Sequence, residues 1–159
     1  MAPPEGVWKV NCDASFSKSN GRSCVAYICR DRSGSIIHFN VKYFQCQSAL
    51  HAEVLAVWEA VAFASNHQSQ NFVIESDCLS AINLCSDHSE VWPWDCEVVG
   101  LEISGLVSLY NNVSFNHVRR IANHVADWLT KHPSALVLYD SVFNVHPGFL
   151  DILQKDLSV

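Results

Sequence analysis

The first third of the chain alternates between apolar and polar residues. Every second residue from Trp8 to Phe16 is apolar, and a period of two predicts a β-strand whose two faces differ in polarity. The pair Asn20-Gly21 suits the positive backbone angles of a tight hairpin, and Gly34 marks a second turn. The runs that flank these turns predict an antiparallel meander of three strands. The strands cover residues 7–16, 25–30 and 36–44.

The spacing of the apolar residues then changes to that of helices. Between Ser48 and about Ala64 they recur at helical spacing with no internal Gly or Pro, which predicts a long helix. The chain up to Pro133 then predicts a short strand, two helices, a fifth strand and a last long helix, and a further short helix is expected near the C-terminus. These elements cover, in chain order, residues 72–75, 79–84, 96–110, 113–118, 122–129 and 147–153.

This order of elements predicts the architecture. Parallel neighbours need crossover connections, so a meander followed by strand-helix crossovers indicates an α/β fold with a mixed sheet and helices on its faces. The 159 residues, 49% of them apolar, are enough for one core. We expect a single domain over residues 1–159, with residues 1–6 as an N-terminal extension and residues 133–159 as a C-terminal tail.

Charge and cysteine content exclude several classes of protein. Ten Lys and Arg against sixteen Asp and Glu give a net charge of −6, which argues against nucleic-acid binding through a large basic surface. The seven cysteines form no Cys-x-x-Cys pair, and we interpret them as reduced thiols of a cytosolic or nuclear protein rather than as disulfides or zinc ligands. No apolar run approaches the roughly 18 residues of a membrane span, and the N-terminus does not look like a secretory signal.

Four acidic residues stand at positions that suggest chemistry. Asp13 lies near the middle of the first strand, where Asp is rare. Glu53 lies on a stripe of alanines along the first long helix, and such a stripe marks close approach to a neighbour. Asp77 follows the strand at 72–75, at the carboxyl end where ligands gather in sheets of this kind. Asp127 belongs to the last helix.

Each of these acids also has a purely structural explanation. Asp13 can face solvent from a half-exposed strand, and Glu53 can lie at the edge of a packed helix face. Asp77 can serve as the N-cap of the helix that follows it. Asp127 can be a solvated residue on a polar helix face that it shares with Asn123.

Taken together, the four carboxylates come from four separate elements and supply the oxygen ligands that select magnesium or manganese over softer metals. Two such ions about 4 Å apart can clamp the attacking and leaving oxygens of a phosphodiester displacement. Chemistry of this kind does not need a basic protein.

Four segments of the chain, taken in order and spacing, resemble a known family. The segments cover residues 3–15, 49–60, 73–78 and 117–127. They resemble a ribonuclease H domain, specifically the plant reverse-transcriptase-like branch associated with retroelement polyproteins, and the resemblance covers roughly residues 3–132. It implies a five-stranded mixed sheet whose first three strands are antiparallel, and it places Asp13, Glu53, Asp77 and Asp127 as the catalytic acids and metal ligands.

The resemblance also implies an activity. Two magnesium ions, or manganese in their place, would support cleavage of the RNA strand of an RNA/DNA hybrid. Selectivity for RNA would come from contacts to 2′-hydroxyls. Candidate substrate contacts are Ser15, Arg119, Arg120 and His124, and with so few basic residues we expect weak, salt-sensitive binding. A monomer is expected.

The chain departs from the family pattern at several places. Ala14 stands where many relatives have Gly, and residues 86–97 contain four acids and no Lys or Arg where some relatives carry a basic projection. Two alternatives to the enzyme therefore stay open. One is a domesticated domain that acts as a non-catalytic binding or regulatory module, with its acidic surface serving a protein partner. The other, an exonuclease of the same superfamily, needs a different acidic motif.

Overall fold

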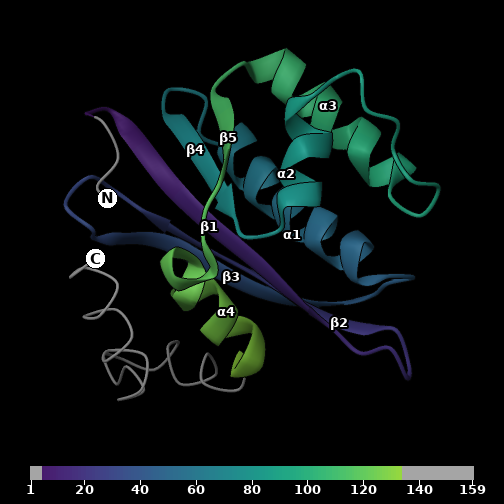
Figure 1. Ribbon diagram of the computed structural model, residues 1–159. Helices are drawn as coiled ribbons and strands as arrows, with labels where there is room; N and C mark the ends of the chain where they lie inside the picture. The colour runs from purple at the N-terminus through teal and green to yellow at the C-terminus, as the bar shows by residue number, and fades with distance from the viewer. Residues whose placement is uncertain (1–4, 134–159) are drawn as a thin grey trace.

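Five strands form one mixed sheet with the order β3-β2-β1-β4-β5 (Figure 1). The computed structural model describes residues 5–133. β1 pairs antiparallel with β2, and β2 pairs antiparallel with β3, whereas β1–β4 and β4–β5 are parallel. The predicted meander and mixed sheet are confirmed, and β1 lies at the centre. The strand bounds are β1 Val7–Phe16, β2 Arg22–Arg30, β3 Ile36–Gln45, β4 Asn71–Ser76 and β5 Val113–His117.

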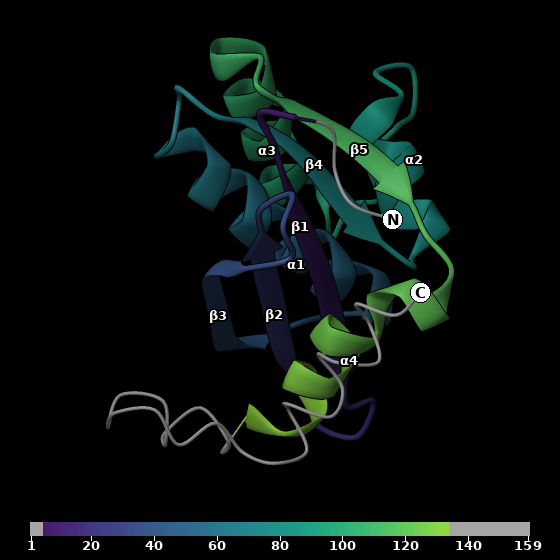
Figure 2. The same cartoon turned by 90° about the vertical axis from the view of Figure 1, so that its left-hand side faces the viewer.

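The helices cover both faces of this sheet. α1, α2 and α3 lie on one face, and the 3₁₀ helix η1 and α4 lie on the other (Figures 1 and 2). None of the helices in the described part of the chain is long and apolar enough to cross a membrane. The helix bounds are α1 Ala49–Ser65, α2 Leu79–Ser86, α3 Glu97–Tyr110, η1 Arg120–Asn123 and α4 His124–Lys131.

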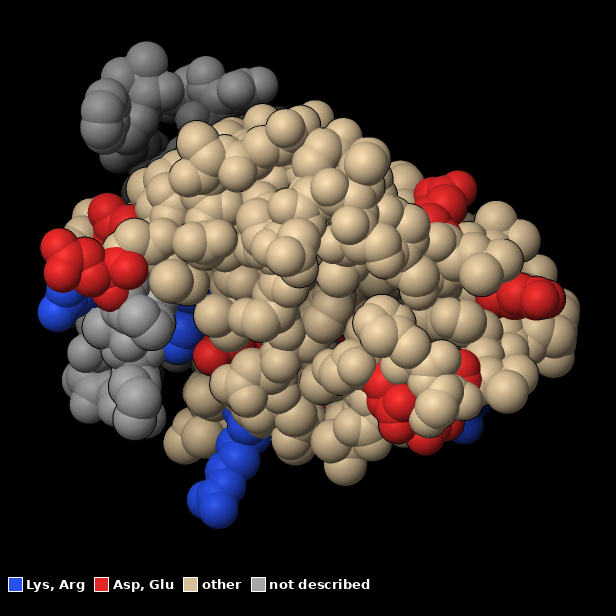
Figure 3. Space-filling view, turned by 90° about the horizontal axis from the view of Figure 1, so that it is seen from above, with Lys and Arg blue, Asp and Glu red and all other residues tan. Residues whose placement is uncertain are grey.

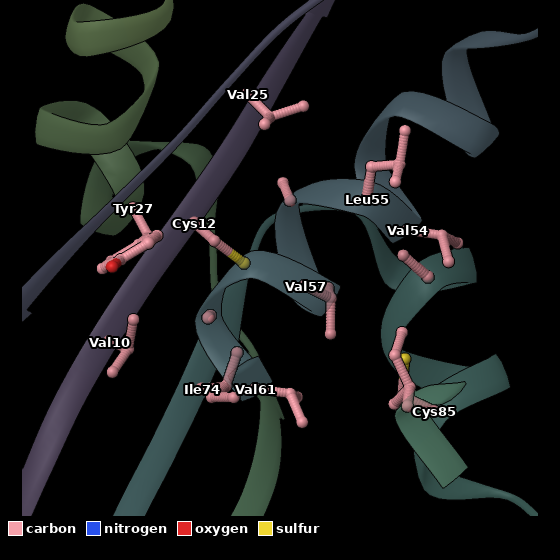
Figure 4. Packing of buried hydrophobic residues seen from close by; sticks show 14 of the residues in the cluster. Val10, Cys12, Val25, Tyr27, Val54, Leu55, Val57, Val61, Ile74 and Cys85 are labelled. Atoms are coloured by element: carbon pink, nitrogen blue, oxygen red, sulfur yellow. The ribbon is translucent and has the colours of Figure 1, made fainter. Parts of the chain in front are cut away.

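Two hydrophobic cores hold the layers together. The larger joins β1, β2 and β4 to α1, α2 and α3, and Figure 4 shows Cys12 pointing from β1 toward α1. Ala56 and Ala60 on α1 are fully buried or nearly so, so the alanine stripe does bring α1 close to the sheet. The smaller core packs Val125 and Leu129 of α4 against β2. Because both faces of β1 are covered, its polar face is buried as well.

All seven cysteines are free thiols, and six of them are buried, which agrees with their interpretation as reduced core residues. Burial raises the pKa of the Cys12 thiol well above its ordinary value, and the nearby Glu53 carboxylate raises it further. Cys12 therefore acts as a small apolar side chain between the sheet and α1.

The prediction of a tight hairpin turn at Asn20-Gly21 is wrong. A loop of five residues joins β1 to β2, and only Gly21 of the predicted pair has a positive φ, at 71°. The Asn20 side chain instead accepts a hydrogen bond of 2.9 Å from the backbone N–H of Arg22. Gly is required at position 21 because a Cβ there would lie 2.7 Å from the carbonyl oxygen of Cys46.

The prediction of a single long helix before Pro133 is also wrong. A four-residue 3₁₀ helix precedes an α4 of eight residues, and the first turn closes with a bond of 2.8 Å from the N–H of Ala122 to the carbonyl of Arg119. The tighter winding accompanies an inward turn of Asn123, whose side chain bonds to the backbone of β1. The short helix expected at 147–153 lies outside the described residues.

Candidate active site

Asp13 lies on the buried polar face of β1. The residue is 5% exposed, so the explanation in which it faces solvent is wrong. The hydroxyl of Thr130 on α4 donates to Oδ2 of Asp13 at 3.1 Å and shares this donor with the carbonyl oxygen of Asp127 at 2.8 Å. Burial, followed by the nearby Asp77 carboxylate, raises the pKa of Asp13 to about 7, while the hydrogen bond from Thr130 acts in the opposite direction.

Glu53 reaches the same region from α1. Its Oε2 is buried and has no hydrogen-bond partner among the residues that the structure describes. Burial raises the pKa of Glu53 to about 9, the carboxylates of Asp13 and Asp77 raise it further, and the backbone N–H of Ala14 opposes the shift. The carboxyl group is therefore turned into the protein, where the backbone N–H of Ala14 and the charge of Arg120 offset the effect of burial only in part.

Asp77 is the residue directly after β4, and the explanation in which it caps α2 is wrong. The N-cap of α2 is Cys78, and within the described chain no side chain caps this helix. Ser76 Oγ accepts a hydrogen bond of 3.1 Å from the Cys78 N–H, in a turn that precedes the helix. The Asp77 carboxylate is thus not used for capping, and it accepts a hydrogen bond of 3.2 Å from the side chain of Asn123.

Asn123 is the functional-site residue that the sequence analysis misplaced. It is 1% exposed, not part of a solvated helix face. Its Nδ2 lies 2.8 Å from the carbonyl oxygen of Cys12 and 3.2 Å from Oδ1 of Asp77. The side chain therefore ties β1, the end of β4 and η1 together at the point where the acids meet. Helical periodicity cannot reveal such a residue, because its partners are distant in the sequence.

Asp127 lies on α4 between two cations. Its carboxylate is 2.7 Å from Nζ of Lys131 and 3.3 Å from Nη2 of Arg120, and its side chain is 19% exposed. Partial burial acts to raise the pKa of Asp127, but the contacts with Lys131 and Arg120 outweigh it and hold the pKa below its ordinary value. Asp127 thus carries a negative charge that Lys131 and Arg120 already partly compensate.

The fold brings the four predicted acids into one electrostatic neighbourhood. The charges of Asp77 and Asp127 both raise the pKa of Asp13, and those of Asp13 and Asp77 raise the pKa of Glu53. Within residues 5–133, however, no three His, Cys, Asp or Glu side chains converge closely enough to hold a metal ion. The acids are therefore near enough to shift one another's pKa values, but as described they do not form a metal-binding cluster.

The donor chemistry of this region fits a hard divalent cation. Carboxylate oxygens are the ligands of magnesium and manganese, and Glu53 Oε2 is a buried acceptor that no described group satisfies. Buried like charges are costly unless a cation compensates them, and Asp13 and Glu53 show this cost as raised pKa values. Asp127 fits least well, since Lys131 and Arg120 already contact it.

The candidate substrate contacts lie around this site with different exposure. Arg119, Arg120 and His124 are exposed, and Ser15 on β1 is half-buried. Arg120 is engaged with Asp127. The sequence analysis did not select His117 for this site, although its Nε2 lies 3.2 Å from the backbone carbonyl oxygen of Asp77.

Comparison with known proteins bears on the family and the fold of the chain. The profile of a family described as Reverse transcriptase-like matches residues 11–133. No curated protein matches the chain in sequence. Among solved structures, LC11-RNase H1, isolated from compost by a metagenomic approach, matches with a TM-score of 0.73 and 17% identity, over 82% of this chain and 99% of that chain.

Two further structures give the same result. RNase H1 from the halophilic archaeon Halobacterium salinarum matches with a TM-score of 0.71 and 17% identity, over 85% of this chain and 99% of that one. LC11-RNase H1 in complex with an RNA/DNA hybrid matches with a TM-score of 0.72 and 16% identity, over 81% of this chain and 99% of that one. At these identities the likeness concerns the fold, and the expected α/β ribonuclease H-like fold is confirmed.

Proposed function

This chain belongs to the reverse transcriptase-like family, and on that premise we propose that it is a divalent-cation-dependent endoribonuclease that cleaves the RNA strand of RNA/DNA hybrids. The observation that carries the proposal is the meeting of acids from β1, α1 and the end of β4, where Glu53 Oε2 is buried and has no hydrogen-bond partner among the described residues. Burial and the neighbouring acids raise the pKa of Asp13 to about 7 and that of Glu53 to about 9. A site that concentrates buried carboxylates in this way is built to attract cations.

Asp13, Glu53, Asp77 and Asp127 would hold the ions, two Mg²⁺ or Mn²⁺ in their place. When bound, such ions stabilise the charge of a phosphodiester displacement and lower the pKa of a bound water. Glu53 would support departure of the leaving oxygen and Asp127 activation of the attacking water, and Asp13 and Asp77 would serve both parts of the reaction.

Other residues of the chain orient these acids and the substrate. Thr130 and Asn123 fix the carboxylates of Asp13 and Asp77 through side-chain hydrogen bonds. Arg119 and Arg120 would contact phosphates, and Ser15 and His124 complete the candidate contacts to the hybrid. With a net charge of −6, affinity for the hybrid is weak and falls with salt.

The finer assignments belong to the same proposal. We place the chain in the plant, retroelement-derived branch on the strength of the four sequence segments that resemble it. We also propose that residues 1–159 act as one ribonuclease H-like domain and as a monomer.

A second candidate function is a non-catalytic binding or regulatory module. The ion pairs of Asp127 with Lys131 and Arg120 favour it, because they occupy one of the four acids. In that case the chain keeps the fold and the acidic cluster but does not bind the two metal ions that cleavage needs.

Cleavage of a labelled RNA/DNA hybrid in Mg²⁺ separates the two functions. The Asp77→Asn variant removes one charge but keeps an oxygen that can accept the hydrogen bond from Asn123. The matched control is Asp87→Asn, the same change at an exposed acid whose carboxylate bonds only to Ser89 in the described structure. We expect the wild type and Asp87→Asn to cleave and Asp77→Asn to lose at least about two orders of magnitude in rate. Equal cleavage by all three proteins, or no cleavage by a folded wild type, contradicts the proposed enzymatic function.

A further inference from the structure

The outward face of α3 is apolar and exposed. Its side chains form one stripe along the helix, and Trp94 extends the stripe into the preceding turn. The exposed fractions are 79% for Trp94, 72% for Val98, 61% for Leu101 and 71% for Leu109. We call this stripe, together with Gly105, the α3 outer face. A run of large apolar side chains that a protein leaves in water marks an interaction site.

Gly105 gives this face a specific shape. It lies four residues from both Leu101 and Leu109, so the three residues follow one another along the same side of the helix. A Cβ at position 105 would meet nothing within 4 Å. The stripe therefore has a shallow gap between two leucines, which is the shape that accepts a side-chain ridge of another helix.

The charges around the α3 outer face have one sign. At 100° per residue, Glu97 and Glu102 lie on opposite sides of the stripe, and both are exposed. The sequence has no Lys or Arg between Lys42 and Arg119, a stretch that holds nine Asp and Glu. Figure 3, seen from the side on which α3 lies in Figure 1, shows a broad uncharged surface with acidic groups and a few basic groups at its margin.

We propose that the α3 outer face is a docking surface for an amphipathic helix of another protein, one whose apolar side is flanked by Lys and Arg. Apolar contact with Val98, Leu101 and Leu109 would supply affinity, and the flanking acids would select basic residues. α3 has 14 residues, which is about 21 Å of helix, so a partner helix of about four turns covers the face.

Charge argues against the other occupants. Two copies of this face would bring Glu97 and Glu102 toward acids alone, which opposes a symmetric dimer. Residues 134–159 contain three Asp and one Lys and so do not supply the positive charge. Nucleic acid and anionic membranes carry phosphates that this surface repels. A basic helix is the occupant that satisfies both the apolar stripe and its acidic margins.

The test uses the full chain and two labelled helical peptides of about 18 residues. Both carry the same leucine stripe, flanked in one by Lys and Arg and in the other by Glu, and fluorescence anisotropy measures their binding. We expect the basic peptide to bind with a dissociation constant below about 100 μM and the acidic peptide to bind at least about tenfold more weakly.

Three variants locate the binding on the protein. Leu101→Ser and the double variant Glu97→Lys/Glu102→Lys should each weaken binding of the basic peptide by at least about tenfold. Ile121→Ser is the matched control, because Ile121 is also an aliphatic residue that is 61% exposed but lies on η1, outside the face. It should bind as the wild type does. Circular dichroism confirms that each variant is folded.

Four outcomes overturn the proposal. They are equal binding of the two peptides, no binding of the basic peptide by folded wild type, and unchanged binding by Leu101→Ser. The fourth is self-association, or binding to anionic vesicles, that Leu101→Ser abolishes, since that would assign the face to a second copy or to lipid. None of these results depends on whether the chain cleaves RNA.

Discussion

The hydroxyl of Thr130 on α4 lies 3.1 Å from Oδ2 of Asp13 on β1, although 117 residues separate the two in the sequence. This contact joins the last described helix to the central strand at the candidate active site. It also holds the carboxylate in one orientation and favours its ionised form.

The first prediction concerns this hydroxyl. Thr130→Val keeps the shape of the side chain but removes the donor, so the pKa of Asp13 should rise above its value of about 7. The free energy of unfolding at neutral pH should fall by about 1 kcal/mol. Carbon-detected NMR titration of the Asp13 carboxyl measures the pKa, and chemical denaturation measures the stability. Thr130→Ser, which keeps the hydroxyl, serves as the control, and a pKa that stays the same in Thr130→Val would refute the role of this contact.

The second prediction concerns pH without divalent cations. The pKa of Glu53 rises from 4.5 in the unfolded chain to about 9 in the fold, and that of Asp13 from 3.8 to about 7. Between the two values of each pair the folded state binds more protons, so the free energy of unfolding falls as pH rises through this window. Each group contributes at most about 1.4 kcal/mol per pH unit to this decrease in the free energy of unfolding.

Denaturation in a chelator from pH 5 to pH 9 measures this slope. Glu53→Gln should make the slope shallower, mainly between pH 5 and pH 9, because the amide does not ionise. Glu90→Gln, the same change at an exposed acid, should leave it unchanged. A wild-type stability that is constant or rises with pH would show that the acids are not held as described.

The third prediction concerns divalent cations. Because a cation that binds the folded state stabilises it, Mg²⁺ should raise the melting temperature at pH 8, where Asp13 is mostly ionised. The gain is about 1.4 kcal/mol when the ion is present at ten times its dissociation constant. Differential scanning fluorimetry with Mg²⁺ from zero to the millimolar range measures this effect. Asp77→Asn should reduce the shift and Asp87→Asn should not; an equal shift in both variants would place the ion elsewhere.

The fourth prediction concerns Lys131, which competes with a cation for Asp127. Lys131→Met removes the contact of 2.7 Å, so Mg²⁺ should bind more tightly. The gain should be no more than about fivefold, because exposed ion pairs contribute about 1 kcal/mol or less. Calorimetric titration measures the affinity, and Lys18→Met, a change at an exposed lysine of the β1–β2 loop, is the control. Weaker binding to Lys131→Met would mean that Lys131 supports the site.

Periodicity predicted the fold because burial follows local pattern here. The alternation along β1 and the helical spacing of α1 both reflect which side chains face the larger core, so their bounds agree closely with the structure. The Asn20-Gly21 turn could not be predicted in this way. Its shape depends on the close approach of Cys46 from the end of β3, a tertiary contact that local sequence does not encode.

The same limit applies to the site. Asp13 and Glu53 stand out in the sequence because acids are unusual in the middle of a strand or on a packed helix face, and Asp77 stands out by its place at the end of a strand. Asp127 is selected only together with the other three. Asn123 does not stand out, because its role depends on the backbone of Cys12, which lies 111 residues away. Polar residues that orient acids from a distant element carry no periodic signal, and a structure is needed to find them.

The most direct test of the account is to locate the cations. A crystal structure of the chain with Mn²⁺, in which the anomalous signal identifies the ions, shows which oxygen atoms contact them. We predict manganese bound by Asp13, Glu53 and Asp77, with Asp127 turned from Lys131 toward the ions. Manganese bound elsewhere, or none at these carboxylates at a concentration that saturates any binding seen by calorimetry, would contradict the claim that the four acids form one cation site.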